Sequence, residues 1–201
     1  MLLVGLTGGL GAGKSTVARM LADRGAVIVD ADELARRAIA PDTPGHRKVL
    51  ESFGDGVLAQ DGSIDRRALA AVVFDDPEAR RALESITHPE VFRMLADEVE
   101  RRRDTDDVVV FDAPLIVETG FDEATDVLVV VALDPALQVE RVVARGMDRA
   151  EAEARIAAQA SPEERRSRAD EVLRNDGDLE DLERQVEALW ERLRRSAAER
   201  R

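Results

Sequence analysis

Short apolar runs alternate along the chain with longer stretches in which apolar residues recur every three or four positions. Short apolar runs bounded by turn residues are typical of buried strands, and the longer spacing is typical of helices. We expect strands at 2–6, 26–29, 108–111 and 127–131, and a last strand at 170–173, on an edge of the sheet. This alternation predicts an α/β fold in which helices flank a mostly parallel sheet.

The pattern changes between Pro41 and about Arg103, where strand-like runs disappear and helical spacing dominates. This region is expected to be a helical insertion between two halves of the sheet, where it would shape a second substrate pocket. The expected parts are a sheet-bearing core at 1–33, 105–134 and 166–195, the insertion at 34–104, and an arginine-rich helical segment at 135–165. The polar end of the chain, 196–201, is expected to be a disordered tail.

The segment from Gly8 to Ser15 reads GGLGAGKS and fits the phosphate-binding pattern G-x-x-x-x-G-K-[ST]. Its glycines let backbone N–H groups approach phosphates, Lys14 is expected to reach the β- and γ-phosphates, and Ser15 is expected to place its hydroxyl on Mg²⁺. The alternative is a glycine-rich turn that binds nothing. A strand-type run before the segment and an apolar helix face after it favour the phosphate-binding interpretation.

Acidic residues stand at the ends of two expected strands. Asp30 and Asp32 follow the second strand, and Asp112 follows the third. Residues at the carboxyl ends of strands in open α/β sheets face the ligand crevice. We expect one of Asp30 and Asp32 to cap the next helix and the other to act chemically, and we favour Asp32 for the chemistry. Asp112 is expected on the Mg²⁺ side of the site, with a plain turn role before a proline as the alternative.

Polar side chains recur on one helix face within 135–165. Gln138, Arg141 and Arg145 are three and four residues apart, which places them on the same face. A solvated charged face and a mobile segment whose arginines close over a nucleotide fit this spacing equally well. His88 stands in the insertion, where a packing or capping role is favoured over catalysis.

Composition narrows the classes of partner. The chain has 201 residues and a net charge of −13, which disfavours binding to nucleic acids and to anionic membranes. Aromatic residues make up 3% of the chain, which leaves little for stacking on bases. Cysteine is absent from the sequence, so a disulfide framework and a thiolate zinc site are excluded. The sequence contains no signal-peptide pattern and no run of transmembrane length, so we expect a cytoplasmic protein, and we also expect a monomer.

Several motifs occur in order between Val4 and about Leu189. They are GLTGGLGAGKST at 5–16, DADELAR at 30–36, DGSIDRRALAAVVF at 61–74, ITHP at 86–89, DAPLIVE at 112–118, Q-x-x-R-x-x-x-R at 138–145, and Ala169-Asp170 with Asn175. Very many proteins share the phosphate-binding loop, but the ordered set resembles the dephospho-coenzyme A kinase family. Ala113 is a small departure, because a larger aliphatic residue is common before the proline in that family.

The resemblance implies an enzyme that transfers the γ-phosphoryl group of ATP to the 3′-hydroxyl of the ribose of dephospho-coenzyme A. It implies a P-loop kinase core, a helical coenzyme-binding insertion at 34–104 and a helical lid at 135–165. ATP and Mg²⁺ are the implied cofactors, and dephospho-coenzyme A is the implied small-molecule substrate.

The same resemblance assigns roles to individual residues. Lys14, Asp32 and Arg141 carry the implied catalysis, with Asp32 as the base or orienting group for the 3′-hydroxyl. The implied ATP-binding residues are Gly11, Ala12, Gly13, Lys14, Ser15, Thr16, Arg145 and Asn175, and Ser15 is also the implied metal ligand. The implied substrate-binding residues are Thr7, Asp32, Arg66, His88 and Asp112.

Two other interpretations remain open at this point. One is another P-loop kinase that acts on a small molecule or a nucleoside monophosphate. The other is a nucleotide-dependent switch, which the absence of an N-K-x-D guanine motif from the sequence disfavours. A panel of phosphoryl acceptors would separate the first from a dephospho-coenzyme A kinase, and slow turnover without a partner would indicate the second.

Overall fold

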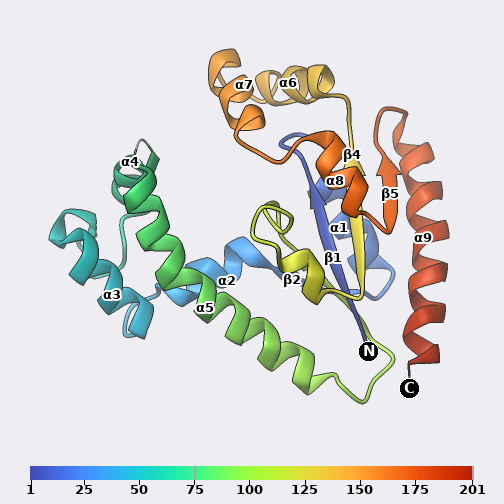
Figure 1. Cartoon of the computed structure of the whole chain (residues 1–201), viewed down its shortest axis with the longest axis horizontal. Helices are drawn as coiled ribbons and strands as arrows, with labels where there is room; N and C mark the ends of the chain where they lie inside the picture. The colour runs from blue at the N-terminus through green and yellow to red at the C-terminus, as the bar shows by residue number, and fades with distance from the viewer. Residues whose placement is uncertain (75, 201) are drawn as a thin grey trace. The chain divides into compact units, whose positions relative to one another are not determined.

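A computed structural model describes residues 1–74 and 76–200 (Figure 1). The chain forms two compact units, the first made of residues 1–29 with 102–201 and the second made of residues 30–101. The second unit interrupts the first in sequence.

The first unit is built on a sheet whose strand order is β2-β3-β1-β4-β5 in the described residues. The strands are β1 (Leu2–Gly8), β2 (Val27–Asp30), β3 (Val108–Asp112), β4 (Val127–Ala132) and β5 (Glu171–Arg174). β1 pairs in parallel with β3 on one side and with β4 on the other, and β5 pairs in parallel with β4. All seven residues of β1 are buried, as expected of the central strand in a parallel sheet with both faces covered.

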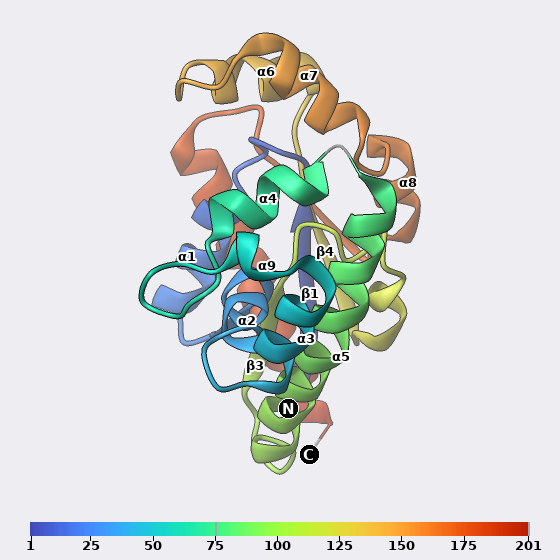
Figure 2. The ribbon, with the colours of Figure 1, turned by 90° about the vertical axis from the view of Figure 1, so that its left-hand side faces the viewer.

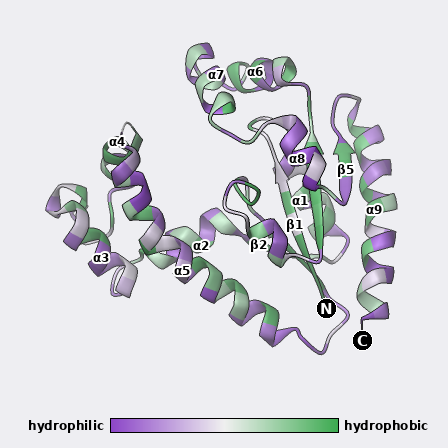
Figure 3. Ribbon diagram, viewed as in Figure 1, coloured by the Kyte–Doolittle hydropathy of each residue, from purple (hydrophilic) through white to green (hydrophobic). Residues whose placement is uncertain are grey.

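Helices α1 (Lys14–Asp23) and α9 (Leu179–Glu199) pack against the sheet and against each other. The buried stripe of α9 has a spacing of three and four residues, and its members Leu182, Val186, Leu189 and Leu193 are at most 2% exposed. Each of these side chains contributes on the order of 1.5–3 kcal/mol by leaving water. In Figure 3 β4 is green, whereas α9 carries both colours, as an amphipathic helix should.

The polar end of the chain differs from the expected disordered tail at 196–201. Helix α9 continues through Glu199, and Ala197 is fully buried in the core. A single alanine among charged residues is too weak an apolar signal to predict this packing. The last residue of the expected tail, 201, lies outside the described residues.

Residues 135–165, called the lid segment below, hold helices α6 (Pro135–Val143) and α7 (Arg149–Ala157) and the start of α8 (Pro162–Arg168). Asp134 and Asp148 cap α6 and α7, because their carboxylates accept N–H groups of the first turn. The lid segment has a small apolar cluster of its own, formed by Val139, Val142 and Ala152. Helix α8 lies against β4, in front of it in Figure 1.

The second unit is helical in its described residues, as predicted for the insertion. Its elements are α2 (Ala31–Ala38), α3 (Pro44–Phe53), α4 (Arg66–Phe74), α5 (Pro77–Arg101) and a short 3₁₀ turn, η1 (Asp55–Val57). Figure 2 shows α3 and α4 beside the long α5, which contacts α2, α3 and α4. The apolar core of the second unit consists of Val49, Val57, Ile64, Leu69 and Ile86.

Candidate active site

The phosphate-binding loop lies between β1 and α1. Gly11 and Gly13 have φ angles of +77° and +98°, a region that glycine adopts at little cost. The loop closes with a hydrogen bond from the Ala12 N–H to the Gly9 carbonyl, 2.9 Å long. Helix α1 then begins at Lys14 without a side-chain cap and without an acidic residue in its first turn. Its N–H groups are therefore oriented for an anion, as the sequence motif predicts.

Asn175 fixes one side of this loop. Its Nδ2 donates to the Ala12 carbonyl over 2.7 Å. A Cβ atom added at Gly13 would lie under 3.0 Å from the same Nδ2. Asn175 directly follows β5, whose parallel pairing with β4 brings it to the loop end of the sheet. The loop glycine is thus required by packing as well as by its φ angle.

Lys14 and Asp112 are brought together at the same end of the sheet. The Lys14 ammonium forms an ion pair with the Asp112 carboxylate, and their side chains are 18% and 8% exposed. Asp112 ends β3, next to Leu6 of β1 in the parallel register. The sequence indicated both residues separately, and the strand pairing explains why they meet.

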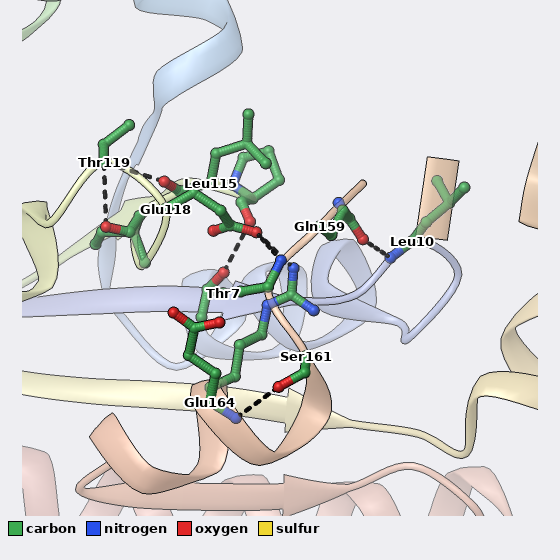
Figure 4. Close-up of polar contacts among 12 residues, drawn as sticks. Thr7, Leu10, Leu115, Glu118, Thr119, Gln159, Ser161 and Glu164 are labelled. Carbon is green, nitrogen blue, oxygen red and sulfur yellow. Dashed lines mark hydrogen bonds and ion pairs between the residues drawn. The ribbon is translucent and has the colours of Figure 1, made fainter. Parts of the chain in front are cut away.

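Thr7, an expected substrate-binding residue, is not open to solvent. The residue is fully buried, and its hydroxyl donates to the Pro114 carbonyl over 3.0 Å. This bond ties β1 to the turn that follows β3 (Figure 4). Its substrate-binding role stays a prediction.

The two arginines expected to act from the lid segment, Arg141 in catalysis and Arg145 in ATP binding, differ in their surroundings. The Arg141 guanidinium donates to the Asn175 carbonyl over 2.8 Å, which joins α6 to the turn after β5. Arg145 is exposed just after the end of α6. Arg141 is therefore linked to the phosphate-binding loop through Asn175, which contacts both.

The structure adds three polar residues that sequence spacing placed on elements but did not pair. Gln159 accepts the Leu10 N–H of the phosphate-binding loop over 3.0 Å. Glu118 pairs with Arg165 over 2.9 Å, and Figure 4 shows its carboxylate pointing at that guanidinium. Gln138 is buried and donates to the Leu133 carbonyl over 2.9 Å. Gln159 and Glu118 lie in turns outside the helices and far in sequence from their partners, so only the fold reveals these contacts.

A cavity of about 550 Å³ lies beside the loop. It is lined by the ends of β4 and β5, the start of α6 and one side of α8, and it reaches the loop at Gly9. Its charged lining residues are the bases Arg165, Arg166 and Arg174 and the acids Asp134, Glu163 and Asp176. Lys14, Ser15 and Asp112 are not among its lining residues.

The remaining candidates lie in the second unit. Asp30 caps α2, because its carboxylate accepts the N–H groups of Asp32 and Glu33 over 2.8 and 3.0 Å. This confirms the capping half of the expectation for the Asp30 and Asp32 pair. Asp32 itself is exposed in the first turn of α2, and Arg66 is exposed at the start of α4.

His88 is half-buried within α5 and faces the Phe92 ring, with 5.9 Å between ring centroids. The two rings are one helical turn apart on α5 and form an aromatic contact, which agrees with the packing role expected for His88. Its contact with substrate stays a prediction.

Asp61, in the second unit, has a clearly lowered pKa. The Ser63 hydroxyl and backbone N–H donate to its carboxylate over 2.6 and 3.0 Å, and these bonds hold its pKa below the ordinary 3.8. In the described residues no group of three or more histidine, cysteine or acidic side chains is arranged to hold a metal ion, and no helix there is long and apolar enough to cross a membrane.

A phosphate-binding loop between β1 and α1 of a parallel sheet, with an arginine-bearing helical segment after β4, defines a P-loop kinase. The family model described as dephospho-CoA kinase matches residues 2–181. A dephospho-CoA kinase from Geobacter sulfurreducens is 47% identical over 193 residues, which cover 94% of this chain and 98% of that protein. The chain belongs to the dephospho-CoA kinase family.

Solved structures agree with this placement. A crystal structure of a Thermus thermophilus protein, 41% identical, matches with a TM-score of 0.82 and covers 96% of this chain and 97% of that one. The dephospho-CoA kinase from Campylobacter jejuni, 21% identical, shares the fold with a TM-score of 0.74 over 96% of this chain and 98% of its own. The predicted fold class and the predicted family are therefore confirmed, and the protein is an ATP-dependent kinase. The comparisons give no support to the alternative kinase or switch interpretations.

Proposed function

We propose that the protein transfers the γ-phosphoryl group of ATP to the 3′-hydroxyl of the ribose of dephospho-coenzyme A. The observation that carries this proposal is the phosphate-binding loop, with Lys14 and Ser15 at the start of α1, in a chain of the dephospho-CoA kinase family. Phosphoryl transfer needs positioning and charge neutralisation more than covalent chemistry by the protein.

The residues around the loop hold the donor nucleotide in this proposal. The backbone N–H groups from Gly11 to Thr16 bind the phosphates, and the Lys14 ammonium exchanges the Asp112 carboxylate for the β- and γ-phosphate oxygens. Arg141 and Arg145 neutralise charge that develops on the transferred group, and Asn175 adjoins the adenine. This role for Asn175 is supported by its bond to Ala12, which places it beside the loop.

Mg²⁺ is the proposed metal. The Ser15 hydroxyl is exposed in the first turn of α1 and offers a hard oxygen ligand, which fits a Mg²⁺ ion that keeps several waters and binds substrate phosphates. When bound, Mg²⁺ would neutralise the phosphate charge. Asp112 lies at the same end of the sheet and is the second oxygen donor that we assign to this side of the site.

Asp32 is the proposed base. Because Asp30 makes the cap of α2, the Asp32 carboxylate is not needed for that purpose. The 3′-oxygen forms a bond to the γ-phosphorus, the bond to the bridging oxygen of ADP breaks, and the hydroxyl proton passes to Asp32. Thr7, Arg66, His88 and Asp112 complete the proposed acceptor side, in the helical insertion and at the ends of β1 and β3. We also propose a cytoplasmic enzyme and a monomer, and the monomer is supported by the contacts that Lys14, Asp112 and Arg141 make within one chain.

The test is a phosphoryl-transfer assay with ATP and Mg²⁺, with and without dephospho-coenzyme A, beside a panel of nucleosides, nucleoside monophosphates and small alcohols. We expect ADP release that depends on dephospho-coenzyme A, and a product phosphorylated on the 3′-hydroxyl. ADP release with a different acceptor alone, or no transfer at all, would overturn the proposal. Light scattering on the eluting protein tests the monomer.

A further inference from the structure

The phosphate-binding loop and the lid segment are joined at Leu10. The Leu10 side chain packs against the apolar cluster of the lid segment, Val139, Val142 and Ala152. Its backbone N–H donates to the Gln159 Oε1 over 3.0 Å (Figure 4). One loop residue is therefore held by the lid segment through both its side chain and its backbone.

This position is the one where the loop most needs a restraint. Leu10 stands between Gly9 and Gly11, and glycine leaves the neighbouring peptide units free to rotate. A carboxamide oxygen on the Leu10 N–H fixes the orientation of the peptide unit that joins Gly9 to Leu10. The direction of a loop amide decides whether it can face a phosphate oxygen.

Glu118 sets the place of Gln159. The Ala160 N–H, directly after Gln159, donates to the Glu118 Oε1 over 2.8 Å. The Arg165 guanidinium donates to the same oxygen over 2.9 Å. One carboxylate thus fastens both the residue after Gln159 and the helix α8 that begins two residues further on.

The Glu118–Arg165 ion pair is largely buried, so neither side chain can lose its partner without a cost in stability. The side chains of Arg165 and Glu118 are 5% and 22% exposed, and the Arg165 Nε has no hydrogen-bond partner. Loss of the Glu118 carboxylate would leave a buried guanidinium without its ion-pair partner and would release the Ala160 N–H. The turn that carries Gln159 would then shift.

We propose that Glu118 is a positioning residue for phosphoryl transfer, which acts through Ala160 and Arg165 to hold Gln159 on Leu10 of the phosphate-binding loop. This inference rests on the proposed function. With the restraint in place, the loop amides and the lid arginines keep one arrangement around the transferred group. Without it, the loop still binds nucleotide, but the transferred group is held less accurately and water competes with the acceptor.

The experiment measures ADP and 3′-phosphorylated product separately, from ATP, Mg²⁺ and dephospho-coenzyme A, for Glu118→Ala, Glu118→Gln and Gln159→Met. Gln159→Met keeps the length of the side chain but removes the oxygen that accepts the Leu10 N–H. We expect Gln159→Met and Glu118→Ala to lower kcat at least tenfold and to raise the ratio of ADP to product above one, with KM for ATP changed less than threefold. Glu118→Gln, which keeps an oxygen acceptor, should recover part of the lost kcat.

The matched control is Arg168→Ala. Arg168 also fastens α8, through two 3.0 Å bonds to Asp122, but it lies at the far end of the helix from Gln159. It should leave the ratio of ADP to product at one. An equal rise in that ratio for Arg168→Ala would mean that any loosening of α8 has this effect, and the inference would be wrong.

A double variant completes the test. If Glu118 acts through Gln159, the variant with both Glu118→Ala and Gln159→Met should lose no more kcat than the worse single variant. The inference would be overturned if the double variant lost kcat by the product of the two single losses. It would also be overturned if Gln159→Met kept a ratio of ADP to product of one and a kcat within twofold of the parent. Should Glu118→Ala fail to fold, Gln159→Met and Glu118→Gln decide it alone. A parent protein that transfers nothing to dephospho-coenzyme A would instead overturn the proposed function.

Discussion

The Lys14 ammonium is paired with the Asp112 carboxylate, one from the first turn of α1 and the other from the last residue of β3. The Asp112 residue is only 6% exposed, so the pair lies largely out of solvent. Removing the ammonium takes a charge partner away from a carboxylate that lies largely out of water, which costs stability. The pair therefore makes Lys14 important for stability as well as for the proposed chemistry.

The variant Lys14→Ala should lower kcat by about 10²–10³-fold, the usual loss when one electrostatic partner of the transition state is removed. It should also lower the free energy of unfolding by about 1.5–3 kcal/mol, the typical contribution of a hydrogen bond to a charged group. The transfer assay measures the first effect and urea unfolding measures the second.

The double variant Lys14→Ala with Asp112→Asn separates the two effects. Neutralising the acid should restore part of the stability and none of the activity. If the double variant regained activity, Lys14 would have no part in catalysis.

The variant Gly13→Ala should abolish nucleotide binding. It meets the Asn175 side chain under 3.0 Å and must adopt a φ of +98°. Gly25→Ala is the control, because Gly25 has a φ of +107° but its nearest neighbour would be Trp190 at 3.9 Å, an ordinary contact. Calorimetric titration with ATP should show loss of binding only in the first variant, while both lose about 1–2 kcal/mol from the left-handed backbone. Equal ATP affinity in both would rule out the contact with Asn175 as the reason for glycine.

Substitutions of Asp30, the cap of α2, and of Asp32, within α2, should have different effects, the first on stability and the second on turnover. Asp30→Ala should lower the free energy of unfolding by about 1 kcal/mol, because it removes the α2 cap. Asp32→Asn should keep stability within about 0.5 kcal/mol, as an exposed substitution, and lower kcat by orders of magnitude if Asp32 is the base. Paired unfolding and turnover measurements test this. Near-normal turnover of Asp32→Asn would show that the base lies elsewhere.

Asp61 should respond to removal of its neighbour's hydroxyl. Its pKa in the folded protein is lowered below 3.8 by the Ser63 bonds, so the stabilisation is present above about pH 3.8 and is lost as the pH falls through the folded pKa. Ser63→Ala removes one donor and should raise the Asp61 pKa toward its ordinary value, as followed by NMR titration of the carboxyl carbon. Ser85→Ala, whose hydroxyl donates to the Ala82 carbonyl, should leave that pKa unchanged.

The sequence was a good guide wherever one segment determines its own structure. The strand runs, the loop from Gly8 to Ser15 and the helical insertion are local patterns of apolar spacing and glycine, and each is found in the structure. The family resemblance followed from the order of such local motifs. These features need no knowledge of which segments meet.

The rest depends on contacts between segments far apart in the chain. Asn175 meets Ala12 because β5 lies beside β4, and Glu118 meets Arg165 because α8 lies on the sheet. Asn175 and Glu118 both lie in connecting segments between helices and strands, so spacing alone gives no partner for either residue. The same reason explains Ala197, whose burial comes from the core that α9 covers and not from its neighbours in sequence.

The packing of Leu10 on Val139, Val142 and Ala152 has a consequence for the evolution and engineering of this enzyme. The lid segment is not an exchangeable module, because one of the side chains packed on its apolar cluster comes from more than a hundred positions earlier in the chain. A chimera that takes residues 135–165 from a relative would also need the residue that the relative has at position 10. Substitutions at position 10 and in the apolar cluster of the lid segment should therefore be correlated among relatives.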